Sequence, residues 1–134
     1  MTTPLDHLVV DASAVMACCL GEAGYERLEA VLTSSAQLVM SAPTRLELGM
    51  VSLHKNIQLR VDQSIQTYQI QIEPFTQAHA TLAIAAFAQY GKGRHPAALN
   101  FGDCCAYALA KSLNLPLLYK GNDFAQTDIA SALA

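Results

Sequence analysis

The sequence has few charged residues and no long uninterrupted apolar run. Charged residues make up 14% of its 134 residues, whereas hydrophobic residues make up 52%. That apolar share excludes a disordered chain, and seven glycines with five prolines are too few for low-complexity sequence. A chain of this length can fill one hydrophobic core, so we expect residues 1–134 to form a single globular domain.

Signals for membrane insertion or export are also missing. The longest stretch without a charge or turn former, residues 80–88, is well short of the roughly 18 to 20 residues that span a bilayer. The N-terminal residues show no basic cluster before an apolar stretch, because the first apolar segment ends at Asp11. We therefore expect a cytoplasmic protein without a membrane contact.

The cysteines lack the spacing of a zinc site. All four fall in two adjacent pairs, Cys18-Cys19 and Cys104-Cys105. Neighbours on a helix point about 100° apart, so neither pair can chelate a metal as a CxxC loop does. We expect reduced thiols that contribute to packing.

Hydrophobic periodicity alternates between strands and helices along the chain. Short apolar runs predict strands at residues 8–10, 37–40, 70–72 and 117–119. Helical spacing and capping residues predict helices at residues 13–20, 25–34, 44–53, 58–68, 76–90 and 100–114, with a short one after residue 123. This order predicts an α/β fold with a parallel sheet of about four strands, flanked by helices on both faces.

Four of the eleven acidic residues stand where strands end or the following helices begin, namely Asp11, Glu47, Asp103 and Asp123. Ligands of parallel α/β sheets bind at the carboxyl ends of the strands, so we expect these acids to converge there. Unpaired carboxylates in one cleft repel each other, which requires neutralising cations. Oxygen ligands of this kind favour Mg²⁺, with Mn²⁺ as an alternative, and such ions support phosphodiester hydrolysis.

Helix capping offers a structural interpretation of the same acids. Asp11 can cap the helix that follows it, and Asp103 can complement a helix dipole. Thr44 and Glu47 fit a capping box, which predicts Thr44 as the first cap of its helix. These alternatives stay open at the level of the sequence.

The chain resembles the PIN-domain ribonucleases, and within them the VapC toxins of bacterial VapBC toxin–antitoxin modules. The resemblance covers essentially the whole chain. It rests on the segments VVDASA (9–14), SAPTRLE (41–47), PF (74–75), YGKGRHPAALNFGD (90–103) and LYKGNDF (118–124).

This resemblance implies a PIN-like three-layer α/β/α fold with a short parallel sheet. It implies an endoribonuclease that depends on Mg²⁺ or Mn²⁺, hydrolyses RNA phosphodiester bonds and acts as the toxin of a type II toxin–antitoxin module. The implied partners are the RNA substrate, a VapB-like antitoxin and a second copy of the chain in a homodimer.

The family's catalytic and metal-binding acids fall on Asp11, Glu47 and Asp103, and its small hydroxyl residue falls on Ser13, in a secondary role. Many relatives carry the fourth acid two residues before an Asp-Phe pair, where this chain has Gly121.

The fourth acid is therefore assigned to Asp123, again with catalytic and metal-binding roles. Asn122 is a secondary candidate beside it, and Asp128 could share or replace its role.

The formal net charge of −3 shows no overall basic field for nucleic acid. Basic residues nevertheless gather in the loop before Asp103. They and the lysine after the last strand predict a cationic rim that binds substrate phosphates, made of Lys92, Arg94, His95 and Lys120, with Arg45 as a further candidate. A solvated loop explains the same residues.

Other functions fit the sequence less well. A receiver-type signalling domain would use Asp11 and Lys120, but it needs a phosphorylatable aspartate at a middle strand, which this chain lacks. A haloacid-dehalogenase-like phosphatase needs D-x-D, where this chain has Asp11-Ala12-Ser13. The remaining alternative is a catalytically degenerate PIN-like module that binds RNA or a partner without turnover, and metal-dependent RNA cleavage separates the two.

Overall fold

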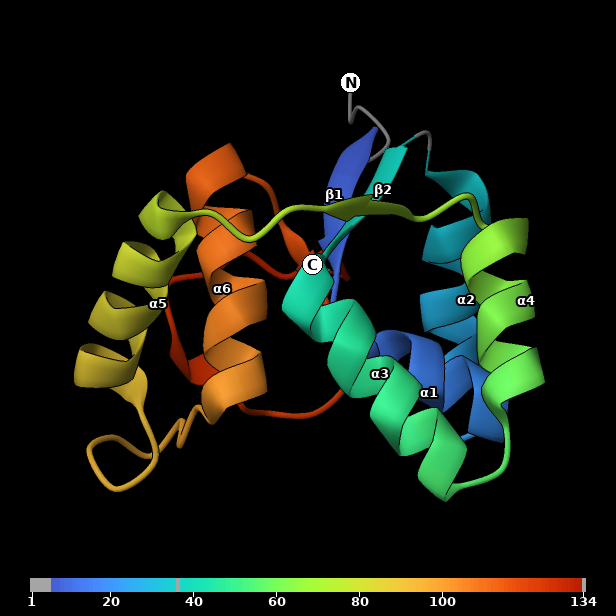
Figure 1. Cartoon of the computed structure of the whole chain (residues 1–134), viewed down its shortest axis with the longest axis horizontal. Coiled ribbons are helices and arrows are strands. Elements are labelled where there is room, and N and C mark those ends of the chain that lie inside the picture. The colour runs from blue at the N-terminus through green and yellow to red at the C-terminus, as the bar shows by residue number, and fades with distance from the viewer. Residues whose placement is uncertain (1–5, 36, 134) are drawn as a thin grey trace.

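The computed structural model describes residues 6–35 and 37–133, in which strands alternate with helices (Figure 1). The strands are β1 (His7–Val10), β2 (Gln37–Ser41), β3 (Gln71–Glu73) and β4 (Leu117–Leu118). The helices are α1 (Ala12–Leu20), α2 (Tyr25–Ser34), α3 (Ala42–His54), α4 (Gln58–Thr67), α5 (Gln77–Tyr90), α6 (Phe101–Leu113) and the 3-10 helix η1 (Phe124–Gln126).

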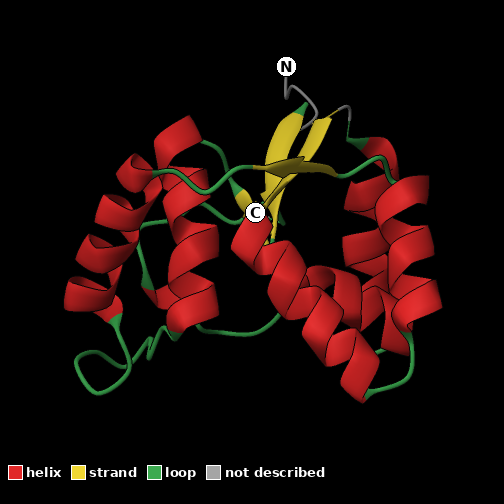
Figure 2. Ribbon diagram, viewed as in Figure 1, coloured by secondary structure: helices red, strands yellow, loops and turns green. Residues whose placement is uncertain are grey.

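The four strands form one parallel sheet in the order β3-β2-β1-β4 (Figure 2). Val9 of β1 pairs with Val39 on one side and with Leu117 on the other. The chain thus adds β2 and β3 on one side of β1 and β4 on the opposite side. The carboxyl end of β1 is therefore the topological switch point, where open parallel sheets bind their ligands.

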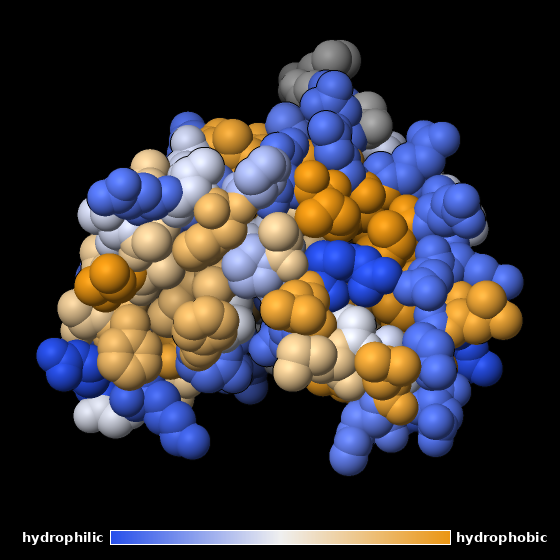
Figure 3. All heavy atoms as spheres, in the orientation of Figure 1, coloured by the Kyte–Doolittle hydropathy of each residue, from blue (hydrophilic) through white to orange (hydrophobic). Residues whose placement is uncertain are grey.

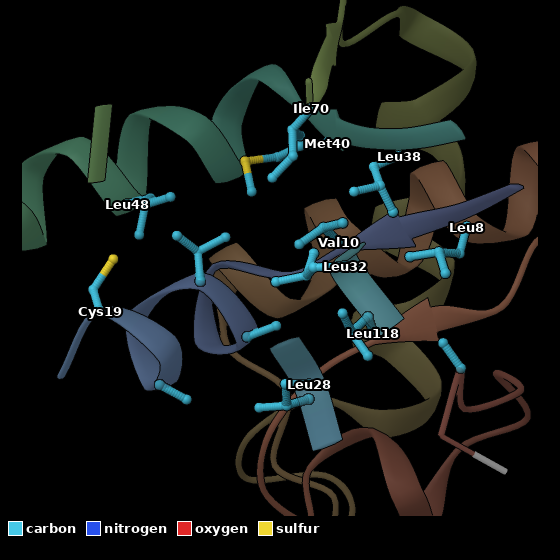
Figure 4. Close-up of a cluster of buried hydrophobic side chains, with 14 of the residues drawn as sticks. Leu8, Val10, Cys19, Leu28, Leu32, Leu38, Met40, Leu48, Ile70 and Leu118 are labelled. Carbon is cyan, nitrogen blue, oxygen red and sulfur yellow. The ribbon is translucent and has the colours of Figure 1, made fainter. Parts of the chain in front are cut away.

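One face of the sheet packs against α1, α2, α3 and α4. Val10 and Met40 point from neighbouring strands toward Leu48 of α3 and Cys19 of α1 (Figure 4). All four side chains are buried. Helices from the first half of the chain thus cover this face of β1, and α5 and α6 cover the other, which fits the unbroken apolar run Leu8–Val10.

The opposite face packs against α5 and α6. Val9 and Val39 contact a cluster that includes Ala86 of α5 and Ala106 of α6. Small residues on both helices let them approach the sheet and each other closely. The predicted three-layer α/β/α architecture is confirmed.

The predicted helix ends agree with the structure at several positions. Gly21 ends α1 and Asn114 ends α6, both in the left-handed conformation, with φ of 64° and 53°. Asn100 caps α6 as predicted. The capping box predicted for Thr44 is wrong: α3 begins at Ala42, Ser41 is its cap residue, and Thr44 is fully buried within the first turn.

The cysteines are free thiols in the described part of the chain. Cys19, Cys104 and Cys105 are buried, and burial raises the pKa of Cys104 to about 11. Cys104 therefore remains protonated near neutral pH, and the buried thiols serve packing, as expected. Across residues 6–35 and 37–133, no helix has the length and apolar character needed to cross a membrane.

Candidate functional site

Asp11 lies directly beyond β1, at the switch point of the sheet, and only 5% of its surface is exposed. Its Oδ2 accepts two hydrogen bonds from Ser13, one from the hydroxyl at 2.6 Å and one from the backbone N–H at 3.1 Å. The Ser13 hydroxyl in turn accepts a bond of 3.0 Å from the backbone N–H of Lys120. Ser13 therefore connects Asp11 to the segment that follows β4.

Glu47 projects from the second turn of α3 toward the beginning of α6. Its carboxylate lies so close to Gly102 that a β-carbon there would fall 2.7 Å from Oε1 and nearer still to Oε2. A side chain at residue 102 would therefore force the Glu47 carboxylate to move away from this position. Because Thr44 forms no capping box with it, Glu47 is free of that structural role.

Asp103 stands in the first turn of α6 and combines a capping role with a place near the other acids. Its Oδ2 accepts a hydrogen bond of 3.0 Å from the backbone N–H of Asn100, and the Asn100 side chain accepts one of 2.9 Å from Asp103. This reciprocal capping box holds the carboxylate at the helix start.

The charges of these acids act on one another. Burial, with a smaller contribution from the charge of Glu47, raises the pKa of Asp11 to about 6 against the lowering effect of the Ser13 hydrogen bonds. Burial also raises the pKa of Asp103 to about 6, with smaller contributions from the charges of Asp11 and Asp123. The pKa of Glu47 is raised by burial and by Asp103. The acids therefore form a repelling cluster whose charged state is disfavoured without a cation.

The segment after β4 carries the remaining acidic candidates. Asp123 is exposed and precedes η1 without capping it through its side chain. Asn122 beside it is exposed as well. Asp128 belongs to a different network, because it accepts hydrogen bonds from Tyr107 at 2.7 Å and from Lys111 at 2.6 Å. Asp123 is thus the residue of this segment whose charge reaches Asp103.

The donor chemistry of the cluster fits a hard divalent cation. Its donor atoms are carboxylate oxygens, and the space left by Gly102 lets Glu47 approach the start of α6. Within the described residues, no three acidic, histidine or cysteine side chains already stand close enough to hold an ion. The carboxylates of these acids lie near one another and would have to turn toward a shared ion. The metal site predicted from the sequence therefore stays a prediction.

The basic residues expected at the rim occupy different surroundings. Lys92 and Arg94 are exposed in the loop between α5 and α6. His95 is half-buried, its Nδ1 accepts a hydrogen bond of 3.0 Å from the Ala97 N–H, and its ring meets Tyr90 edge-on.

Two other basic residues form ion pairs. The Lys120 ammonium lies 2.9 Å from Glu22, and Arg45 lies 2.7 Å from Asp62 on α4. Arg45 thereby joins α3 to α4. Lys120 remains about one-third exposed beside the acidic cluster.

Two residues near the acids were missed as site residues by sequence reasoning. Gly102 had a signal, since a glycine in the first turn of an apolar helix is costly without a reason. Glu22 had none, because its ion pair with Lys120 spans 98 residues of sequence.

An apolar surface adjoins the acidic cluster. Phe101, 80% exposed, stands between two grooves, one lined by α5 and α6 and the other by α3. Figure 3 shows apolar side chains gathered over these helices. Its most exposed members besides Phe101 are Leu46, Met50, Ile84 and Phe87.

Comparison with known proteins agrees with this geometry. The profile of the PIN domain family matches residues 8–130. The chain belongs to the PIN-domain family. This PIN domain is 40% identical over 129 residues to the ribonuclease VapC42 of Mycobacterium tuberculosis, a match that covers 93% of this chain and 98% of the relative.

Solved structures share the fold of this PIN domain. The sarcin-ricin loop cleaving toxin VapC20 of Mycobacterium tuberculosis superposes with a TM-score of 0.74 and 14% identity, covering 92% of this chain and 96% of the toxin. A toxin–antitoxin complex from Klebsiella pneumoniae gives a TM-score of 0.68 and 19% identity, over 90% of this chain and 92% of the other. At such low identity these likenesses establish the fold alone.

Proposed function

We propose that this PIN domain is a divalent-metal-dependent endoribonuclease that hydrolyses RNA phosphodiester bonds, and that it is the toxin of a type II toxin–antitoxin pair. The observation that carries the proposal is the 40% identity with a VapC ribonuclease over nearly the full length of both chains. The acidic cluster at the switch point of the sheet supplies a site for the reaction. We treat residues 1–134 as one domain acting in the cytoplasm.

Asp11, Glu47 and Asp103 would hold the ion through carboxylate oxygens, with Asp123 as the fourth acid and Asn122 as a neutral neighbour. Bound Mg²⁺ or Mn²⁺ supplies activation of a water and neutralisation of phosphate charge. The raised pKa values fit this role, because positive charge at the cluster favours the ionised carboxylates.

The chain's own contribution is positioning. Ser13 holds Oδ2 of Asp11 through two hydrogen bonds, and the capping box fixes Asp103 at the start of α6. Glu47 is seated by the absence of a side chain at Gly102. These contacts limit the range of positions from which the carboxylates turn toward an ion, which lowers the entropic cost of assembling the site.

RNA would bind along the exposed basic residues beside the acids. Lys92 and Arg94 can contact phosphates from the loop that leads to α6, with His95 next to them. Lys120 can contribute once its ion pair with Glu22 opens, since both side chains are about one-third exposed. Such contacts position the backbone without reading sequence.

The proposed antitoxin would block the same acids. An arginine inserted among Asp11, Glu47 and Asp103 would neutralise them and pair with a carboxylate through two parallel hydrogen bonds. We expect a small VapB-like protein with a basic segment to co-purify with the chain, since the solved toxin–antitoxin complex shares its fold.

The proposed homodimer would use the apolar surface around Phe101. A protruding phenylalanine between two apolar grooves is self-complementary, because each copy can place its ring in a groove of the other across a two-fold axis. Exposed apolar side chains of this number on one face are typical of interaction surfaces.

Cleavage of total RNA by the purified chain, freed of any antitoxin, tests the function. We expect cuts at defined positions with Mg²⁺ or Mn²⁺, loss of cutting with a chelator, and at least a roughly 100-fold loss in Asp11→Asn and Asp103→Asn. Asp62→Asn, which removes an exposed acid of α4, is the control and should cut normally. Intact RNA under all conditions would indicate the degenerate binding module instead.

A further inference from the structure

Two buried hydroxyl groups at the start of α3 have no hydrogen-bond partner in the described part of the chain. They are Oγ of Ser41 and Oγ1 of Thr44, in residues that are 1% and 0% exposed. A buried hydroxyl left unpaired destabilises the folded state, so a protein rarely keeps one, and here two lie within one helical turn.

Neither hydroxyl is used for helix capping. Ser41 is the cap residue of α3, yet its side chain makes no capping bond, and Thr44 follows in the first turn. By contrast, Ser52 lies buried further along the same helix and donates to the Gly49 carbonyl at 2.7 Å. Among the described residues of α3, the buried hydroxyls without partners thus lie at the end of the helix that meets the sheet.

The position of Ser41 brings one of the two hydroxyls next to Asp11. Continuing the register of β1 and β2 beyond the pair Val9 and Val39 places Ser41 opposite Asp11. Side chains alternate along strands, so Asp11 and Ser41 share the sheet face of Val9 and Val39, which packs against α6.

One carboxylate oxygen of Asp11 receives no side-chain hydrogen bond in the described part of the chain. The hydroxyl and the backbone N–H of Ser13 both donate their hydrogen bonds to Oδ2 of Asp11. Within residues 6–35 and 37–133, no side chain donates to Oδ1. Two buried hydroxyls and one carboxylate oxygen supply the three polar contacts that a buried water typically makes.

We propose that Ser41 and Thr44 hold a buried water that donates a hydrogen bond to Oδ1 of Asp11. The two residues are then positioning residues that act on Asp11 through this water. Ser13 and the water restrain the carboxylate from opposite oxygens, and their combined effect fixes its orientation. This inference deepens the proposed nuclease function. The part of its test that measures RNA cleavage rests on that function.

A double-mutant cycle tests the proposal on the whole chain, independently of catalysis. Thr44→Val keeps the shape of the side chain and removes the hydroxyl, and we expect it to lower Tm by about 4 °C. In an Asp11→Ala background, the same substitution should lower Tm by clearly less, because the water has lost one of its partners. Thr44→Ser keeps the hydroxyl and should retain the coupling to Asp11, and Ser52→Ala should show none.

Two further readouts complete the test. A high-resolution crystal structure should contain a water within hydrogen-bond distance of both hydroxyls and of Oδ1. In cleavage assays, Thr44→Val and Ser41→Ala should lower kcat roughly tenfold with KM unchanged, and Thr44→Ser should restore it.

The proposal is overturned if Thr44→Val leaves Tm unchanged or raises it, since that is the behaviour of a dry, unpaired hydroxyl. An empty site in the crystal structure overturns it as well. If the parent chain fails to cleave RNA while the Tm coupling and the water are found, the proposed function fails and the water site stands.

Discussion

The carboxylate of Glu47 on α3 lies against the backbone of Gly102 on α6, at a distance that a β-carbon would prevent. These residues are far apart in sequence, and their contact joins the helix after β2 to the helix before β4. Since Asp103 follows Gly102 directly, the same contact sets how near Glu47 comes to Asp103, whose charge raises its pKa.

Gly102→Ala is expected to reduce RNA cleavage at least tenfold, because the new methyl group displaces Glu47 from the cluster. Gly49→Ala is the matched control. It also adds a methyl group within a helix, but that group would meet only the flexible end of Arg45, 3.3 Å from Nη1. It should cut normally and gain up to about 1 kcal/mol in stability from helix propensity. Initial cleavage rates and urea unfolding measure both effects, and equal cleavage rates for the two variants would contradict the steric argument.

The metal-free chain is expected to become more stable as the pH falls from 7.5 to 5. Burial raises the pKa of Asp11 and Asp103 to about 6 from 3.8, so the folded state binds protons that the unfolded state does not. The resulting stability is fully present below about pH 4 and is lost as the pH rises through 6. For the fully buried Asp11, the difference amounts to at most about 3 kcal/mol.

Asp11→Asn isolates this contribution. At pH 7.5 the neutral side chain should make the variant more stable than the parent chain in chelator, and at pH 5 the difference should shrink. Urea unfolding at both pH values measures it, with Asp62→Asn as the control at an exposed acid. A variant that is less stable than the parent at pH 7.5 argues against burial as the cause.

Ser13→Ala is expected to lower kcat about tenfold, because it removes the 2.6 Å hydroxyl bond to Asp11 and the acceptor of the Lys120 N–H. The loss of a donor to the carboxylate should also raise the pKa of Asp11 further. Ser13→Thr retains the hydroxyl and serves as the control. Rates of metal-dependent cleavage between pH 5 and 8 measure both changes, and an unchanged Ser13→Ala profile would show that Asp11 is held by other groups.

Phe101→Ser is expected to convert the proposed dimer into a monomer, because the ring is 80% exposed and flanked by apolar grooves. Leu59→Ser is the control, since Leu59 is 69% exposed but lies on α4, outside this surface. Light scattering after size-exclusion chromatography measures the mass of each variant. If the Phe101→Ser variant remains a dimer, the dimer interface does not lie at the surface around Phe101.

The order of strands and helices could be predicted from the sequence because periodicity, caps and breakers act locally. The apolar run of β1, the left-handed ends at Gly21 and Asn114, and the Asn100 cap all follow from residues close together in the chain. The capping box at Thr44 failed because its pattern describes an exposed helix start, whereas tertiary packing buries this one.

By itself, the sequence determined the alternation of strands and helices, the family resemblance and the candidate acids, since each depends on residue types at local spacing. Only the tertiary structure decided that the Glu47 carboxylate lies against Gly102, that Lys120 pairs with Glu22, and that Ser41 and Thr44 lie buried with no partner among the described residues. Those relationships depend on how α3, α6 and the sheet are packed across long sequence separations, where local pattern carries no information.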